Sequence, residues 1–500
     1  MPSIHIERTA GPIWTRAIGP VIVAAVGVFM LRWTWLTWPD PIVDYGRELY
    51  VPWRLSEGDV LYRDIEYFNG PLSPYLDALL FCAFGVGLRT LVWFNVLNIA
   101  LITALIYHLV GRCTDRWAAT TGAIVFLTLF AFAQFGGVGN YNYVCPSSYE
   151  LTHGIALSLA ALACVGAYAR SGGAGWAAGA GGLLGLVFLT KAEVFLAALA
   201  AVGAAMLICA RFSRRWRHLL LMGAVAILPP LVALILLLRN LSLPEALDGL
   251  AGSWKWIGDR NLTGLPFFRR ISGTRDLGQS LQVIAIGGAT YGLIVLCATA
   301  AARALHGRPL AARVLALTCL VAIPSLGWRL ASYHVWDDFV RPAPMLLGVT
   351  LAVLGRELIR RRDDSSGRHR LALSVALCIF AMVMLLKVFF NAHIYHYGFA
   401  LAMPATMALV GLLVGWMPAR AQRIGAEPWL PRAVGLAVLI AVAGAYLPKT
   451  RDLIERKTNI VASGADKFYA DRTRGAVREV VRHINFAISP SATLVAIPEG

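Results

Sequence analysis

The sequence carries ionisable residues at spacings that suit acid–base chemistry. Asp44 is followed four residues later by Glu48, so a short helix would place both carboxylates on one face. A partly desolvated carboxylate beside Arg47 could act as a general base on a hydroxyl group, whereas a solvated loop acid would have no such role. Glu150 and His153 lie three residues apart at the start of an apolar run. This spacing suits a hydrogen-bonded pair, a metal site or contacts to a polar head group, and no third ligand decides among them.

Basic residues occur where a phosphate group could bind. Lys191 and Glu193 lie between two apolar runs, where an ionisable side chain is costly unless it is paired or faces a cavity. Lys191 either binds phosphate or extends to the membrane surface. Later polar turns add Arg341 and the pair His396 and Tyr397. These turns could hold a lipid-linked phosphate and stabilise it as a leaving group, or they could form an aromatic and polar belt at the interface.

Membrane-spanning helices are the elements that must position these residues. Of the 500 residues, 58% are hydrophobic and 15% are charged, and the mean hydropathy is +0.64, which excludes disorder and an ordinary soluble domain. We predict an all-α polytopic membrane protein with about 13 transmembrane helices. The apolar stretch 72–88 is interrupted by Pro74 and Asp77, and we expect it to lie in the interface plane. The expected spans are 18–37, 91–110, 118–134, 151–168, 177–189, 194–210, 219–238, 283–301, 314–330, 345–358, 371–390, 399–416 and 433–446.

The distribution of charge predicts the orientation. The net charge is +17, but the basic residues gather between apolar runs, as the positive-inside rule expects of cytoplasmic loops, so no nucleic-acid partner is expected. With a cytoplasmic N-terminus and an uncleaved first span, the first outward loop covers about residues 39–90. The outward segments hold most of the carboxylates and polar aromatic residues, and we expect any chemistry on the outer face. The eight cysteines contain no CxxC pair and support neither a zinc site nor a disulfide framework.

Four motifs carry a resemblance to a known group of enzymes. The first loop reads Gly-Asp-Val-Leu-Tyr-Arg-Asp over 58–64 and Tyr-Phe-Asn-Gly-Pro-Leu-Ser-Pro-Tyr over 67–75. The later motifs are Leu-Thr-Lys-Ala-Glu over 189–193 and His-Ile-Tyr-His-Tyr-Gly over 393–398. Together with the early Asp44, they resemble a bacterial branch of the GT-C membrane glycosyltransferases. These are relatives of the dolichyl-phosphate-mannose protein mannosyltransferases and the lipid A aminoarabinose transferase.

The resemblance implies a polyprenyl-phosphate-linked sugar as donor, a site that faces the periplasm and an Asp in the first loop as base. By position that base is Asp44, although the mannosyltransferases often have an adjacent Asp-Glu pair where this chain has Tyr45. We expect inversion at the transferred sugar, and donor-phosphate binding by Lys191, Arg341 and His396. The residues expected to bind substrate are Glu48, Tyr62, Asp64, Asn69, Tyr143, Glu150, His153, Glu193 and Tyr397.

The sequence therefore predicts a glycosyltransferase of the bacterial inner membrane that acts on a glycan, lipid or protein acceptor. No cofactor is certain, and a divalent cation stays an open alternative. We expect one transmembrane domain over 1–447 and a short periplasmic segment over 448–500, for which a truncated end is one alternative. The absence of a Trp-Trp-Asp motif and of a large C-terminal domain argues against an oligosaccharyltransferase. A transporter or lipid flippase is the rival, but no internal repeat is visible and the polar clusters lie at span ends. A non-catalytic scaffold would leave those clusters without a common purpose.

Overall fold

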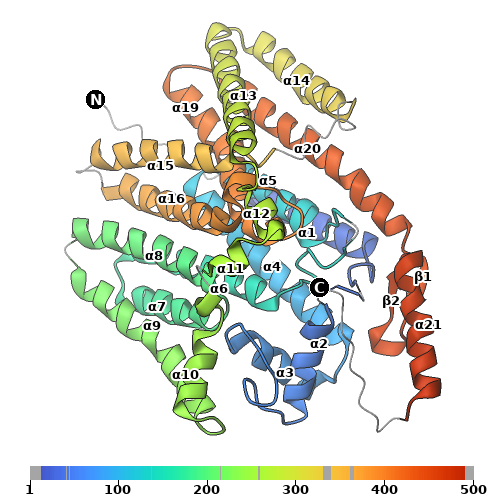
Figure 1. Ribbon diagram of the computed structural model, residues 1–500. Helices are drawn as coiled ribbons and strands as arrows, with labels where there is room; N and C mark the ends of the chain where they lie inside the picture. The colour runs from blue at the N-terminus through green and yellow to red at the C-terminus, as the bar shows by residue number, and fades with distance from the viewer. Residues whose placement is uncertain are drawn as a thin grey trace.

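The computed structural model describes residues 13–40, 42–43, 45–136, 138–213, 215–256, 259–329, 339–360 and 365–489. The proposed base Asp44 lies outside the described residues. Within them the chain is almost entirely helical (Figure 1). The first helices are α1 (Ile13–Trp33), α2 (Tyr45–Ser56), α3 (Leu72–Phe84), α4 (Leu88–Cys113), α5 (Arg116–Phe126) with the π-helical turn η1 (Leu127–Ala131), α6 (Tyr149–Ser171), α7 (Ala174–Phe188), α8 (Ala192–Ser213) and α9 (Trp216–Leu237).

The second half of the chain adds further long helices and several short ones. The short elements α10 (Leu243–Ala251), η2 (Gly252–Trp256), α11 (Arg260–Thr263) and α12 (Pro266–Ser272) follow α9. The long helices that come next are α13 (Leu277–Ala304), α14 (Pro309–Arg329), α15 (Ala343–Arg360) and α16 (Ser365–Met384), which continues as η4 (Leu385–Asn391). The remaining helices before the C-terminal segment are α17 (Gly398–Leu401), α18 (Met403–Val410), η5 (Gly411–Trp416), α19 (Met417–Arg423) and α20 (Trp429–Glu455).

The chain is a multi-pass membrane protein. Among the described residues, nine helical segments are long and apolar enough to cross a bilayer. Shorter apolar helices are α1, α3, α5 with η1, and α7. Each of the expected spans has a helix at its position. The expected count of about 13 is made up of the nine long segments, α15 and three of the four shorter helices. The fourth, α3, has 13 residues. At 1.5 Å per residue it is about 20 Å long, the shortest of these four helices.

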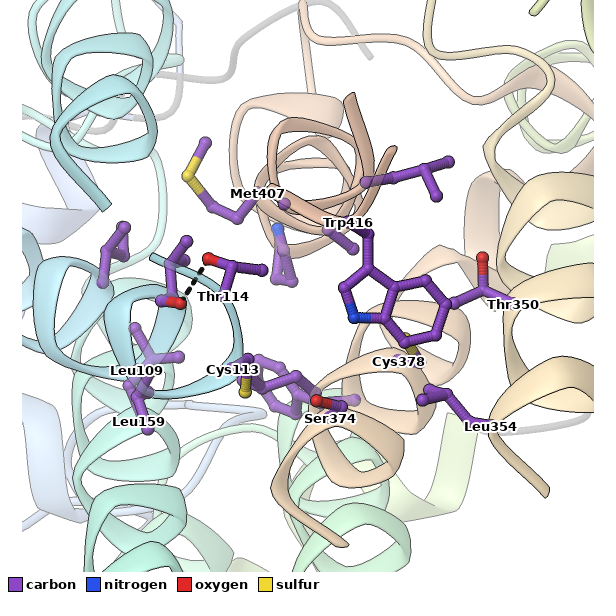
Figure 2. Close-up of a pocket in the computed structure, with 18 of the residues that line it drawn as sticks. Leu109, Cys113, Thr114, Leu159, Thr350, Leu354, Ser374, Cys378, Met407 and Trp416 are labelled. Carbon is purple, nitrogen blue, oxygen red and sulfur yellow. Dashed lines mark hydrogen bonds between the residues drawn. The ribbon is translucent and has the colours of Figure 1, made fainter. Parts of the chain in front are cut away.

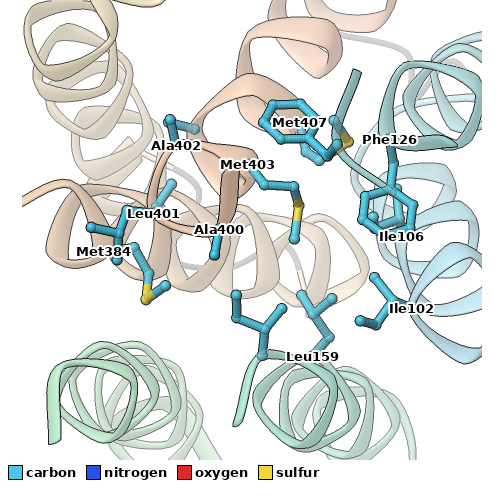
Figure 3. Close-up of a cluster of buried hydrophobic side chains, with 14 of the residues drawn as sticks. Ile102, Ile106, Phe126, Leu159, Met384, Ala400, Leu401, Ala402, Met403 and Met407 are labelled. Carbon is cyan, nitrogen blue, oxygen red and sulfur yellow. The ribbon is translucent and has the colours of Figure 1, made fainter. Parts of the chain in front are cut away.

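The centre of the bundle is packed with flexible and branched apolar side chains. Figure 3 shows Met403 and Met407 of α18 against Ile102 and Ile106 of α4, with Leu159 of α6 on the other side. All five side chains are buried. Because α4, α6, α16 and α18 share this core, the positions of their ends are fixed relative to one another.

The first loop is joined to the turn between α7 and α8. The backbone N–H of Gly70 donates to the carbonyl of Thr190 at 2.8 Å, and that of Leu72 donates to the carbonyl of Leu189 at 3.0 Å. A Cβ at position 70 would lie 2.2 Å from the Leu189 oxygen, so only glycine allows this approach. The Asn-Gly-Pro motif of the first loop thus fixes the backbone that leads to Lys191.

The C-terminal segment packs against the end of the bundle that carries the first loop. Strands β1 (Asn459–Val461) and β2 (Phe468–Ala470) form an antiparallel pair, and α21 (Arg472–Ala487) follows at the right-hand edge of Figure 1. The Arg474 guanidinium pairs with the buried carboxylate of Asp40 at 2.6 Å, and the Tyr469 N–H donates to the Leu36 carbonyl. Helix α20 runs through the expected boundary at residue 447 and ends at Glu455.

Candidate active site

Glu48 lies in a buried position where α2 meets the start of α6. Its side chain accepts a hydrogen bond from Arg47 Nε at 3.1 Å and another from the Tyr149 backbone N–H at 3.2 Å. Burial and the neighbouring Glu150 raise the pKa of Glu48 to about 8, and the opposing effect of Arg47 is smaller. Arg47 also donates to the Ser147 carbonyl at 3.0 Å, so this carboxyl group is held between two helices.

Ser148 connects Glu150 with Lys191. Its hydroxyl donates to Glu150 Oε2 at 2.6 Å and accepts from Lys191 Nζ at 3.3 Å. Glu150 is fully buried in the first turn of α6, and Lys191 immediately precedes α8. Two residues that are 41 positions apart in sequence therefore act on one hydroxyl group at the same end of the bundle.

Two lysines share one carboxylate beside this serine. Lys191 Nζ and Lys387 Nζ each lie 3.8 Å from Glu193 Oε1, and the Lys191 side chain is only 13% exposed. Lys387 belongs to η4 at the end of α16, so the contact joins the start of α8 to the end of α16. Two ammonium groups that share one carboxylate oxygen can also bind a phosphate.

The turn after η4 adds aromatic and imidazole groups. Lys387 Nζ lies 4.6 Å from the ring centre of Tyr397, and His396 Nε2 is 2.9 Å from the Tyr141 hydroxyl. Burial, followed by Lys387, lowers the pKa of His396 to about 4, so its imidazole is neutral at pH 7. Arg341 donates from Nη1 to the Phe390 carbonyl at 3.3 Å, three residues beyond Lys387.

Glu150 and His153 do not form the hydrogen-bonded pair that their spacing allowed. Glu150 bonds to Ser148, whereas His153 Nδ1 lies 3.0 Å from the Ser73 hydroxyl of α3. The His153 ring stacks on Tyr149 with 5.9 Å between ring centres. Their side chains diverge because each finds a partner on a different neighbouring segment, so the spacing alone could not identify the contacts.

The other expected substrate-binding residues lie around this cluster or apart from it. Tyr62 donates to the Asn69 carbonyl at 2.7 Å, and the buried Asn69 amide group has no hydrogen-bond partner among the described residues. Asp64 pairs with Arg63 at the loop surface and accepts a hydrogen bond from the Val60 N–H. The hydrogen bond from Arg63 and then that from Val60 hold the pKa of Asp64 low. Asp64 does not contact the cluster. Tyr143 is packed in the core against Phe126 and Phe399.

The structure thus joins six of the expected residues through successive contacts. They are Glu48, Glu150, Lys191, Glu193, His396 and Tyr397. The expected set lacked Ser148, which has no motif of its own, and Lys387, which the basic outer turn could have indicated. It also lacked Ser73 and Asp77, which lie four residues apart on the buried face of α3. Two polar residues four positions apart within an apolar stretch are the sequence signal that indicates a polar helix face here.

A separate apolar pocket lies toward the other end of the bundle (Figure 2). Its cavity volume is about 90 Å³, and its lining includes Thr114 after the end of α4, Ser374 of α16 and Trp416 of η5. The far ends of α6 and α8 carry Arg170 and Arg211. This pocket has no acidic or basic lining residue, so the polar cluster at the opposite end is the candidate site for chemistry.

Metal binding has no complete ligand set in the part of the chain that the structure describes. No group of three or more His, Cys, Asp or Glu side chains converges there as ligands. Glu48 and Glu150 are instead engaged with Arg47 and Ser148.

Comparison with known proteins adds a match over part of the chain. Residues 69–234, about a third of the sequence, match the family model described as dolichyl-phosphate-mannose-protein mannosyltransferase. No curated protein has a sequence that matches this chain significantly. This match covers the Asn-Gly-Pro motif, Glu150 and Lys191, which are central to the cluster.

Solved structures with similar folds are distant in sequence. The oligosaccharyltransferase of Archaeoglobus fulgidus in the apo form is 13% identical, with 96% of this chain and 59% of that chain covered and a TM-score of 0.49. Its complex with Zn and sulfate is 14% identical, with 90% and 54% covered and a TM-score of 0.47. ArnT from Cupriavidus metallidurans bound to undecaprenyl phosphate is 16% identical, with 82% and 80% covered and a TM-score of 0.37. The chain spans just over half the length of the oligosaccharyltransferase that it matches.

The fold and the site define a polytopic membrane protein with a polar cluster at one end of its helical bundle. Residues 69–234, about a third of the chain, are similar to the dolichyl-phosphate-mannose-protein mannosyltransferase family. The resemblance to this family that the sequence predicts is confirmed over this segment.

Proposed function

We propose that this protein transfers a sugar from a polyprenyl-phosphate-linked donor to a glycan, lipid or protein acceptor, with inversion at the transferred sugar. The observation that carries the proposal is the pair Lys191 and Lys387, whose ammonium groups each lie 3.8 Å from the same carboxylate oxygen of Glu193. Two cations at the end of a membrane bundle suit a phosphate that is anchored in the bilayer by its lipid chain.

The donor phosphate takes the place that Glu193 holds between the lysines. Without the donor, Glu193 keeps the two ammonium groups paired, which limits the cost of holding like charges together near the membrane. When the phosphate binds, Lys191 and Lys387 stabilise the negative charge that develops on it as the bond to the sugar breaks. His396 is neutral and therefore contributes only a hydrogen bond, and Arg341 adds positive charge beside the same turn.

The acceptor is activated by a carboxylate of the first loop, for which Asp44 is the proposed base. Asp44 directly precedes α2, whose Glu48 is part of the cluster. In the proposed step the base removes the proton of the acceptor hydroxyl, and that oxygen attacks the anomeric carbon from the face opposite the phosphate. The bond between the anomeric carbon and the phosphate oxygen breaks, and polyprenyl phosphate leaves with the bonding electrons. A divalent cation, if used, would be additional to these groups.

The remaining parts of the proposal concern topology. We place the site on the periplasmic face of a bacterial inner membrane, with a cytoplasmic N-terminus and about 13 spans. The support is the arrangement of charge. Glu150 lies in the first turn of α6 and Lys191 directly precedes α8, whereas Arg170 and Arg211 lie in the last turns of these two helices. We assign residues 1–447 to the transmembrane unit and 448–500 to a periplasmic segment.

The test compares host cells that express wild-type protein, Asp44→Asn or Glu57→Gln at equal levels. Glu57 is an exposed acid after α2 and serves as the control for loss of one loop carboxylate. We expect Asp44→Asn to accumulate a polyprenyl-phosphate sugar and to lose one residue from an envelope glycan, while Glu57→Gln matches wild type. Full glycan in the Asp44→Asn cells would exclude Asp44 as the base. Unchanged pools in cells that lack the protein altogether would contradict the transferase itself and favour transport.

A further inference from the structure

The C-terminal helix α21 has an apolar side and a basic side. With 3.6 residues per turn, all of its aliphatic side chains fall on one side of the helix, namely Ala476, Val477, Val480, Val481, Ile484 and Ala487. The rest of the circumference holds all four of its arginines, which are Arg472, Arg474, Arg478 and Arg482. An apolar stripe beside an arginine-rich face is typical of helices that lie along a membrane surface.

Most of the apolar side of α21 is open among the described residues. None of the 16 residues of the helix is buried, and Val480 and Val481 are 55% and 47% exposed. Val477 and Ile484 are half-buried, and the main contacts of the helix are with β1 and β2. Figure 1 shows α21 at the edge of the molecule, beside these two strands. A row of exposed branched side chains along one side of a helix indicates an interaction surface.

The start of α21 is held where membrane-spanning helices begin and end. The N–H of Leu88, the first residue of α4, donates to Asp466 Oδ1 at 2.7 Å in the segment before α21. The ion pair between Arg474 and Asp40 joins the first turn of α21 to the chain shortly after the end of α1. Helices α4 and α20 are both long and apolar enough to cross a bilayer, and α20 leads directly into this segment. The helix therefore begins close to the surface of the bilayer that holds the bundle.

The basic side of α21 supplies charge that complements anionic lipid headgroups. Arg474 and Arg482 pair with carboxylates of the chain. Arg472 and Arg478 are exposed, and the structure records no ion pair for either of them within the described residues. Each arginine near an anionic bilayer surface strengthens binding by about fivefold. Because α21 is already tethered beside the bilayer, contact with the lipid is intramolecular and requires no high intrinsic affinity. These conditions favour the lipid surface over a separate protein partner.

We propose that α21 lies on the surface of the bilayer that holds the helical bundle and binds its anionic phospholipids. Val480, Val481 and Ile484 enter the boundary between headgroups and acyl chains, and the exposed arginines bind lipid phosphates. Phe486 is 91% exposed but lies on the basic side of the helix, so it takes no part in this contact. The inference is independent of sugar transfer, because it requires only a multi-pass membrane protein.

The experiment measures backbone hydrogen exchange of α21 in the full-length protein reconstituted in lipid nanodiscs. The discs contain phosphatidylcholine alone or equal parts of phosphatidylcholine and phosphatidylglycerol. One double variant combines Val480→Ser with Val481→Ser, and the other combines Arg472→Gln with Arg478→Gln. Phe486→Ser is the matched control, because it removes a large apolar side chain from the other side of the same helix. Unchanged exchange of β1 and β2 shows that the C-terminal segment is folded in each variant.

We expect α21 of the wild-type protein to exchange about tenfold more slowly in the anionic discs than in the neutral discs. The arginine double variant should lose most of this difference. The valine double variant should exchange about tenfold faster than wild type in the anionic discs, and Phe486→Ser should match wild type.

Equal exchange of wild-type α21 in the two kinds of disc would overturn the proposal. A larger effect of Phe486→Ser than of the valine double variant would also overturn it, because the other side of the helix would then make the contact. Slow exchange that does not depend on the lipid but is lost in the valine double variant would show that protein covers the apolar side, and the proposal would again be overturned.

Discussion

At the scale of single residues, Glu48 gives the site a dependence on pH. Its pKa is about 8 in the folded protein, compared with 4.5 for an exposed glutamate, so the folded state holds a proton that the unfolded state releases between these values. The stabilisation is fully present below pH 4.5 and is lost as the pH rises through 8. We expect the unfolding temperature in detergent to fall from pH 5 to pH 8, and the fall to be smaller in Glu48→Gln.

The control for this prediction is Glu57→Gln, because Glu57 is exposed and its removal should leave the pH profile unchanged. An identical fall in wild type and Glu48→Gln would show that other groups cause the dependence.

Residue types and spacing could identify several members of the site but not their partners. Lys191 and Glu193 could be selected because charge is costly between apolar runs, and the same argument applies to Glu150 at the start of a span. The contact of Lys191 with Ser148 and the sharing of Glu193 by Lys387 depend on how α6, α8 and α16 pack. Spacing within one helix carries no information on such contacts.

At the scale of elements, the first loop positions Lys191 through the close approach of Gly70 to the turn between α7 and α8. A methyl group at position 70 would lie 2.2 Å from the Leu189 oxygen, so the loop must move. We expect Gly70→Ala to lower the stability by about 1–3 kcal/mol and to reduce sugar transfer. Thermal unfolding together with a transfer assay measures both effects.

The matched control is Gly46→Ala on α2, where a Cβ meets no atom within 4 Å. That substitution should be neutral or slightly stabilising because alanine favours a helix. Equal behaviour of the two variants would contradict the role assigned to the loop contact.

Helix positions could be predicted well from the apolar runs, because a bilayer requires long hydrophobic helices. The stretch with Pro74 and Asp77 forms the 13-residue helix α3, and its place in the interface plane stays a prediction. The burial of Ser73 and Asp77 on one face of α3 could not be predicted, since it depends on α2 and α6 covering that face.

At the scale of the whole molecule, the C-terminal segment is tied to the end of α1 by a buried ion pair. Asp40 is 1% exposed on its side chain and pairs with Arg474, 434 positions later in the sequence. Arg474→Gln would leave this buried carboxylate without its charge partner, so we expect a loss of about 3–5 kcal/mol of stability. Adding Asp40→Asn to the Arg474→Gln variant should recover part of the lost stability.

Thermal unfolding of the two single variants and the double variant measures this coupling. Arg482→Gln on α21 is the control, because its pair with Glu479 is exposed and should contribute about 0–1 kcal/mol. Additive losses in the double variant would mean that Asp40 and Arg474 do not act as a pair. This long-range contact has no signal in the sequence, where both residues appear as ordinary loop charges.

The central claim is that Lys191 and Lys387 together bind the donor phosphate, and the direct measurement is sugar transfer from lipid-linked donor in membranes that contain single lysine variants. Lys191→Gln and Lys387→Gln should each lower the rate by about tenfold or more, since each removes a charge-assisted hydrogen bond to the phosphate. Lys255→Gln is the control, because Lys255 pairs with Asp248 at the exposed surface. Wild-type rates in both Lys191→Gln and Lys387→Gln would contradict the account, whereas loss in both with full activity in Lys255→Gln is the result it predicts.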